Sequence, residues 1–218
     1  MEQRGVCFPF WQHLTADEQA RVEPLLRVQH FAAGQTVRGP ESPCLGILFV
    51  RTGALRMSLL SADGRLATIA RTGADEICVL TASCVLAAIT FDVEIDAVED
   101  TEVLTMPSMA LAPLLKNNPY VEAYLYRTAT ELFSDVIGAV ERLLFLTLEQ
   151  RIAAFLLDEA ARQGTDTLHV TQEHLAQQIG SAREAVTRTL KQLSARGCVE
   201  VFRGGVRLSD RAALYALC

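Results

Sequence analysis

Residues 171–191 have the sequence TQEHLAQQIGSAREAVTRTLK, and this stretch decides how the C-terminal part of the chain folds. Apolar side chains recur every three or four residues on both sides of Gly180, which predicts a helix over 171–180 and a second helix over 181–196. Glycine at the junction permits a sharp turn between the two helices. A hairpin with Gly204-Gly205 at its turn is expected to follow. Two helices at a tight turn, followed by a hairpin, are typical of a winged helix-turn-helix.

The second predicted helix carries polar and charged side chains on the face opposite its apolar stripe. Arginine can bond guanine through two parallel hydrogen bonds, glutamate can accept one from cytosine, and threonine and lysine can hold phosphates. Such a face suits the major groove of DNA, and the alternative is a merely solvated helix surface. Thr171 and Ser181 are also placed to cap the two helices. The residues predicted to contact DNA are Thr171, Ser181, Arg183, Glu184, Thr187, Arg188, Lys191, Arg203 and Arg207.

The N-terminal half of the chain has a different pattern, in which short apolar runs alternate with turn signals between residues 8 and 115. Asp63-Gly64 is the strongest of these signals, because glycine accepts the positive φ of a hairpin turn. Antiparallel strands of this length close most readily as a small barrel or roll. A short helix is expected over 82–86. Strands are expected over 28–31, 45–50, 55–60, 66–70, 91–98 and 102–106.

From Pro119 onward the spacing of apolar residues changes to three and four, which predicts a long amphipathic helix. The apolar stripe can pack on the N-terminal domain or form a parallel coiled coil with a second copy, and a wide stripe can do both. The pattern breaks at Thr147-Leu148, where we expect a hinge. The stripe consists of Leu125, Ala129, Leu132, Val136, Ala139, Val140, Leu143 and Leu146.

A β-roll, a long helix, the link FLTLEQRIA at 145–153 and a winged helix-turn-helix, in this order, resemble the CRP/FNR family of bacterial transcription regulators. The resemblance covers nearly the whole chain. The stretch GSAREAVTR at 180–188 is similar to the recognition-helix signature of that family, in which Arg183, Glu184 and Arg188 match the residues that contact bases and backbone.

The resemblance implies an α+β fold in three parts. Residues 1–116 would form an antiparallel β-roll, a jelly roll like that of cyclic-nucleotide-binding domains, that senses an effector. Residues 117–147 would form the dimerisation helix and hinge, and residues 148–218 the winged helix-turn-helix. The chain would be a homodimeric transcription regulator that binds a palindromic operator in double-stranded DNA, with an unidentified small effector and RNA polymerase as further candidate partners.

Two other classes of protein fit the sequence less well. An enzyme would need a nucleophile beside a base, a phosphate-cradling loop or a run of metal ligands, and the sequence shows none of these. A nucleotide-binding adaptor that never touches DNA would not need the winged part. We therefore expect a DNA-binding regulator that is not an enzyme.

The resemblance does not identify the effector, because one fold hosts many sites. Cyclic-nucleotide members of the family place an arginine against the phosphate where this chain has Phe91, which is followed by acidic residues. A cyclic phosphate would lack its guanidinium partner there. Val136 and Ile137 stand where the purine would lie and cannot hydrogen-bond with it, and Glu76 is a partial match to such a pocket. We expect an effector other than cyclic AMP.

Cys78 and Cys84 flank the predicted short helix, at the place where family members bind their effector. They can be small buried side chains, or a pair in which one thiolate is oxidised and the other resolves it. An iron–sulfur cluster would need several N-terminal cysteines, and only Cys7 lies near that end.

The formal net charge of −6 hides a difference between the two parts of the chain. Residues 1–147 carry 11 basic and 18 acidic side chains, whereas residues 148–218 carry 9 basic and 8 acidic ones. A nearly neutral DNA-binding part predicts weak binding to random DNA and dependence on base contacts. Apolar runs fall short of the ~18 residues of a membrane span, and we find no signal-peptide core. We expect a cytoplasmic protein with reduced thiols and no membrane partner.

Overall fold

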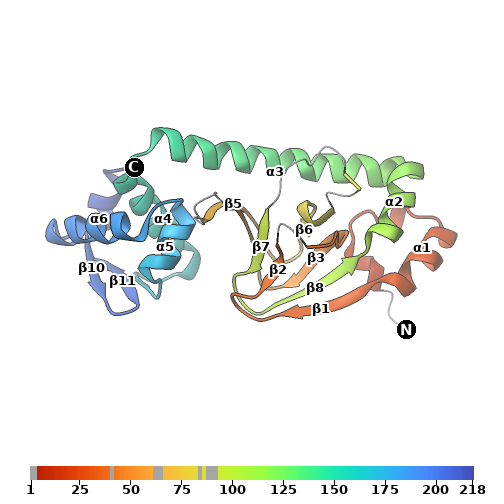
Figure 1. The fold of residues 1–218 in the computed structure, drawn as a ribbon, viewed down its shortest axis with the longest axis horizontal. Helices are drawn as coiled ribbons and strands as arrows, with labels where there is room; N and C mark the ends of the chain where they lie inside the picture. Colours follow the sequence, from red (N-terminus) through yellow and green to blue (C-terminus); the bar gives the residue numbers. More distant parts are fainter. Residues whose placement is uncertain (1–3, 40–41, 61–65, 83–84, 87–92) are drawn as a thin grey trace. The chain divides into compact units, whose positions relative to one another are not determined.

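The computed structural model describes residues 4–39, 42–60, 66–82, 85–86 and 93–218, and its helices and antiparallel sheets confirm the predicted α+β fold class (Figure 1). The chain divides into two compact units. The first unit consists of Met1–Leu59 and Ile69–Val136, and the second of Leu60–Thr68 and Ile137–Cys218. Within the described ranges, no helix combines the length and the apolar character that crossing a membrane requires.

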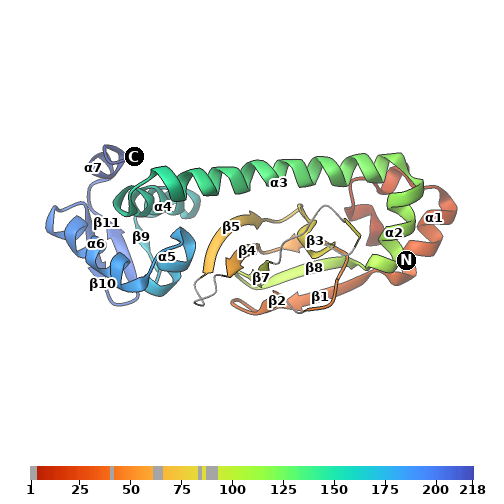
Figure 2. The ribbon, with the colours of Figure 1, turned by 45° about the horizontal axis from the view of Figure 1, so that its top comes forward.

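Two four-stranded sheets form the roll (Figure 2). One sheet has the order β1-β8-β3-β6 and the other the order β2-β7-β4-β5. Met57 of β4 pairs with Ile95 of β7, and both side chains are buried in an apolar cluster. The strands are β1 Arg27–Phe31, β2 Thr36–Arg38, β3 Ile47–Thr52, β4 Leu55–Leu60, β5 Leu66–Thr72, β6 Ile77–Cys78, β7 Glu94–Ala97 and β8 Thr101–Met106.

Most strands predicted from the sequence are confirmed, and the misses have a simple cause. The predictions over 28–31, 55–60 and 102–106 correspond to β1, β4 and β8. The strands β2 and β6 were not predicted, because three and two residues are too few for a two-residue period to emerge. The strand predicted over 91–98 is found as β7, and its residues 91–92 lie outside the described ranges.

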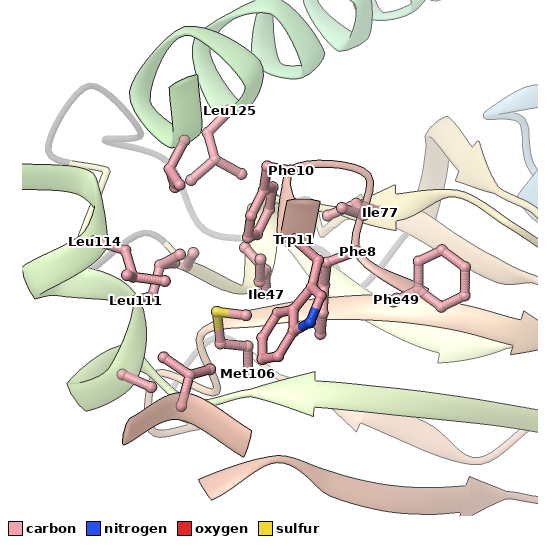
Figure 3. Close-up of a cluster of buried hydrophobic side chains, with 14 of the residues drawn as sticks. Phe8, Phe10, Trp11, Ile47, Phe49, Ile77, Met106, Leu111, Leu114 and Leu125 are labelled. Atoms are coloured by element: carbon pink, nitrogen blue, oxygen red, sulfur yellow. The ribbon is translucent and has the colours of Figure 1, made fainter. Parts of the chain in front are cut away.

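The short N-terminal helices, α2 and the start of α3 share one apolar cluster with the roll. Figure 3 shows Leu111 and Leu114 of α2 and Leu125 of α3 gathered around Phe10. The cluster therefore ties the N-terminal segment to the helices that follow β8. These elements are the 3-10 helices Arg4–Cys7, Trp11–His13 and Glu23–Leu25, α1 Ala16–Val22, α2 Ser108–Asn117 and α3 Pro119–Phe145.

The long helix predicted after Pro119 is confirmed as α3, and its predicted stripe serves the roll along its first half. Leu125 is fully buried, and Leu132 and Val136 pack against the apolar clusters of the first unit. Val140, farther along the stripe, is 41% exposed. The stripe is thus a core surface in its first half and an open surface in part of its second.

The second unit has the predicted order of helices and hairpin, but the turn of the hairpin is one residue earlier than expected. Phe202 pairs with Gly205, so the two-residue turn is Arg203-Gly204, with Gly204 at a φ of 84°. Arg203 therefore lies in the turn itself. The elements are α4 Leu148–Gln163, β9 Thr167–Leu168, α5 Gln172–Ile179, α6 Arg183–Ala195, β10 Val199–Phe202, β11 Gly205–Leu208 and α7 Arg211–Tyr215, and the sheet order is β10-β11-β9.

The short helix expected over 82–86 was predicted too late in the chain. The structure has a 3-10 helix over Leu80–Ala82, and residues 83–84 lie outside the described ranges. The hydroxyl of Thr81 donates to the carbonyl oxygen of Gly46 at 2.6 Å, which holds this helix against the start of β3. This hydrogen bond joins residues 35 positions apart in the chain, so a local sequence pattern could not predict it.

Candidate nucleic-acid interface

The helices α5 and α6 share one apolar core, which fixes their orientation relative to each other. Figure 1 shows both helices and the β10–β11 hairpin. Gly180, in the left-handed region at a φ of 63°, ends α5 and lets the chain turn toward α6. Arg151 of α4 donates from Nη1 to the Ile179 carbonyl oxygen at 2.8 Å and holds the end of α5, and burial lowers the pKa of Arg151. The buried side chains of the pair are Leu175, Ala176 and Ile179 of α5 and Val186, Thr189, Leu190 and Leu193 of α6.

The first turns of the two helices differ in their capping. The Thr171 hydroxyl oxygen accepts a hydrogen bond from the His174 backbone N–H at 3.1 Å, so Thr171 caps α5 as predicted. The prediction that Ser181 caps α6 is wrong, because α6 begins at Arg183 after Ala182, and no side chain in the described ranges caps it. The first backbone N–H groups of α6 therefore remain available to an outside acceptor such as a phosphate.

The face of α6 opposite the core carries predicted contact residues toward solvent. Thr187 is half-buried, and its hydroxyl donates to the side-chain oxygen of Gln172 at 2.6 Å. The predicted contacts that are exposed on this face are Arg183, Glu184, Arg188 and Lys191. The structure thus brings the predicted residues of the second helix together on one surface.

The cations of this surface fall into two groups. Nε of Arg183 lies 4.0 Å from a carboxylate oxygen of Glu173, and Nη1 of Arg207 lies 3.1 Å from one of Glu200. The cations that form no ion pair with any residue the structure describes are Arg188, Lys191 and Arg203. The second group can reach a phosphate or a base without first losing an intramolecular carboxylate partner.

Sequence reasoning missed three residues that support this surface, namely Gln172, Glu173 and Glu200. Glu200 pairs with Arg207 across the hairpin, and the predicted strands could have shown this opposition. No local spacing links Gln172 or Glu173 to α6, because the turn between the helices decides which residues meet.

Of the residues predicted to bind an effector, the structure describes four, and two of these four share one environment. Cys78 is buried in an apolar cluster of the roll, and Val136 of α3 packs against the same cluster. Ile137 is 42% exposed, so it does not share that environment. Cys84 and Phe91 lie outside the described ranges.

Glu76 closes a local turn. This exposed residue accepts a hydrogen bond from the Gly73 backbone N–H at 2.7 Å through its carboxylate. That contact explains the position of Glu76 without a ligand.

The cysteines differ in part from the expectation of reduced thiols. Burial raises the pKa of Cys78 to about 11, so its sulfur remains a protonated thiol at neutral pH. Because the thiolate is the reactive form, Cys78 is a poor redox centre. Cys44, by contrast, is disulfide-bonded, so the expectation that all thiols are reduced is wrong.

The helix break lies where the sequence predicts it. α3 ends at Phe145 and α4 begins at Leu148, after Thr147 in extended backbone. Thr147 and Gln150 form a reciprocal capping box, with hydrogen bonds of 3.3 and 2.9 Å. The break is confirmed, and its action as a hinge stays a prediction.

A β-roll followed by a long helix and a winged helix-turn-helix with a cationic outer face defines a DNA-binding regulator of transcription. Residues 150–217 match the Crp-like helix-turn-helix domain. A solved structure from Eubacterium rectale, assigned to the crp/fnr family of transcriptional regulators, is 32% identical, and the match covers 97% of this chain and 98% of that one with a TM-score of 0.93. The chain belongs to the CRP/FNR family of transcription regulators.

Two further relatives show how widely this architecture occurs. The nitrogen fixation regulation protein FixK of Bradyrhizobium diazoefficiens is 24% identical over 211 residues, which cover 94% of this chain and 87% of that protein. The structure of the c-di-GMP responsive global regulator CLP of Xanthomonas campestris is 20% identical, covers 90% of this chain and 100% of that one, and has a TM-score of 0.74. The similarity to the CLP structure is a similarity of fold alone.

Proposed function

We propose that this chain is a cytoplasmic homodimer that binds a palindromic operator in double-stranded DNA, under the control of a signal sensed in the β-roll. The observation that carries the proposal is the outer face of α6, where Arg188 and Lys191 are exposed on a helix whose start no described side chain caps. Arg203, in the turn of the hairpin, adds a cation that can bind a backbone phosphate. RNA polymerase is the further partner that a transcription regulator of this kind would contact.

An exposed apolar stripe on α3, which shares Val140 with the predicted stripe, supports the homodimer. Its members follow one another at alternating spacings of three or four residues, once Thr130 is included, which is the spacing of a two-stranded coiled coil. Exposed apolar surface of this extent is typical of a surface covered by a partner protein. The exposed members are Tyr126 at 49%, Phe133 at 63%, Ile137 at 42%, Val140 at 41% and Leu144 at 70%.

The signal that we propose is a small molecule other than cyclic AMP. It would favour one setting of the DNA-binding parts over another, with the break at Thr147 as the hinge. The boundaries 1–116, 117–147 and 148–218 remain our proposal for the sensing, dimerising and DNA-binding parts. A thiol-redox signal is the second candidate, and the disulfide of Cys44 favours it more than the buried Cys78 does.

The test uses the full chain and a duplex selected from a random DNA library. Arg188→Glu reverses one charge at the centre of the outer face of α6 and should weaken binding of the selected duplex by about 100-fold or more. Sedimentation should show an unchanged dimer. Arg211→Glu is the matched control, because Arg211 is 44% exposed and pairs with Asp166 away from α6. Unchanged retardation of the duplex by Arg188→Glu would refute the assignment of α6.

The nature of the signal is tested on the same duplex. Binding should not respond to cyclic AMP. A response to a thiol reductant that disappears in Cys44→Ser would favour the redox candidate, whereas indifference to the reductant would favour the small molecule.

A further inference from the structure

The first turn of α5 supports the outer face of α6 through two neighbouring side chains. The side-chain oxygen of Gln172 accepts a hydrogen bond from the Thr187 hydroxyl at 2.6 Å. The carboxylate of the next residue, Glu173, lies 4.0 Å from Nε of Arg183. Residues 183 and 187 are one helical turn apart on α6, so both contacts bind the same turn of α6 to α5.

The pair between Glu173 and Arg183 leaves the reading groups of the arginine available. It involves Nε of the guanidinium, and the two terminal nitrogens remain for the O6 and N7 atoms of guanine. The ion pair of Arg207 is different, because Glu200 lies against Nη1, one of the terminal nitrogens. Arg183 therefore keeps both terminal nitrogens available for a guanine, whereas one terminal nitrogen of Arg207 lies against a carboxylate.

The negative charge of Glu173 also favours a base contact over a phosphate contact. Its side chain is 59% exposed and that of Arg183 is 63% exposed, so both would face the DNA at the start of α6. A carboxylate there repels a backbone phosphate, while it attracts the guanidinium of Arg183 at an ion-pair distance of 4.0 Å. Building repulsion against the wrong contact is a general route to specificity.

We propose that Glu173 is a positioning residue for base recognition: it orients Arg183 toward a guanine and disfavours a phosphate contact by the same side chain. This inference rests on the proposed function, because it assumes that α6 enters the major groove. It assigns Glu173, which lies outside the recognition helix, a part in the choice of sequence.

The experiment measures full-length protein against three kinds of duplex at one salt concentration: the selected operator, its single base-pair variants and a random duplex of equal length. Arg183→Ala should lose discrimination at one G·C position in each half-site, by about tenfold. Glu173→Ala should lose discrimination at the same position, by about threefold to tenfold, and should bind the random duplex more tightly. Glu173→Gln keeps the size of the side chain and removes its charge, so it should behave like Glu173→Ala in both measurements, because the 4.0 Å separation of the pair is an ion-pair distance and longer than a hydrogen bond.

Asp166→Asn is the matched control. Asp166 is 51% exposed and pairs with Arg211 in the same unit, so the variant makes the same change of charge outside α5 and α6. It should leave discrimination at every position unchanged. The inference is overturned if Glu173→Ala raises the affinity for all duplexes by one common factor. A wild-type chain that selects no sequence would instead overturn the proposed function itself.

Discussion

α3 and α6 are both amphipathic helices, yet they expose opposite kinds of surface. α3 buries Leu125 but leaves Phe133 and Leu144 more than half exposed. α6 buries its apolar residues and exposes charged side chains such as Arg188 and Lys191. Periodicity reports which residues share a face, whereas the composition of the exposed face reports what can cover it. An apolar face is best removed from water by another protein, and a cationic face is neutralised by a polyanion.

Charging the apolar face of α3 is expected to have the largest effect. The double change Phe133→Glu and Ile137→Glu should dissociate the dimer, because each apolar side chain contributes ~1.5–3 kcal/mol when it is buried and two copies of each are lost. The dimer dissociation constant should rise about 10⁴-fold, since ~6 kcal/mol corresponds to that factor. Sedimentation equilibrium measures the change.

The control for this variant changes charge on α3 away from the exposed stripe. Asp135→Asn alters an exposed residue that is not part of the stripe, and it should leave the dimer intact. A double variant that stays dimeric would show that a surface other than this stripe joins the two copies.

The second largest effect is expected from salt concentration, which should weaken DNA binding by α6 much more than dimerisation through α3. Three cations form no ion pair with a described residue, namely Arg188, Lys191 and Arg203. If each neutralises one phosphate, a dimer makes six such contacts, so the logarithm of DNA affinity should fall with the logarithm of salt concentration with a slope of about −5. Raising salt from 50 to 200 mM should then weaken DNA binding about 10³-fold. Dimerisation through an apolar stripe should change little over this range. Equal salt dependence of both equilibria would remove the contrast between the faces.

The smallest expected effect is on the free energy of unfolding, through the residues at the starts of α5 and α6. Thr171→Ala removes the cap of α5 and should lower the free energy of unfolding by ~1 kcal/mol. Ser181→Ala should leave it nearly unchanged, because Ser181 caps no helix. Urea denaturation of the two variants makes the comparison. Equal losses would mean that Ser181 stabilises the start of α6 after all.

The sequence predicted the long elements better than the short ones. α3 and the helices around Gly180 contain enough turns for a period of 3.6 residues to appear. α2 was missed, because Pro113 within it is a residue that normally interrupts helices. The cap at Thr171 was predicted correctly and the cap at Ser181 incorrectly, since α6 starts two residues later than the apolar pattern indicates.

The structure places the predicted contact residues of α6 on one helix face, and it brings together only some of the described residues of the predicted effector site. Residues on one helix face stay together whatever the rest of the chain does, so the outer face of α6 followed from spacing alone. Glu76 and Cys78 are close in the sequence, but one closes an exposed turn and the other is buried in the roll. Adjacency in a strand or turn does not determine which side chains share one environment.

By itself the sequence determined the order of β-roll, long helix and helix-turn-helix and the charged outer face of α6, because periodicity, glycine conformation and charge act over a few residues. Only the tertiary structure decided which stripe of α3 is left exposed, which thiol is buried, and that Glu173 meets Arg183. Burial and pairing join residues far apart in the chain. Their free energies depend on desolvation and distance in the folded state, which local patterns do not encode.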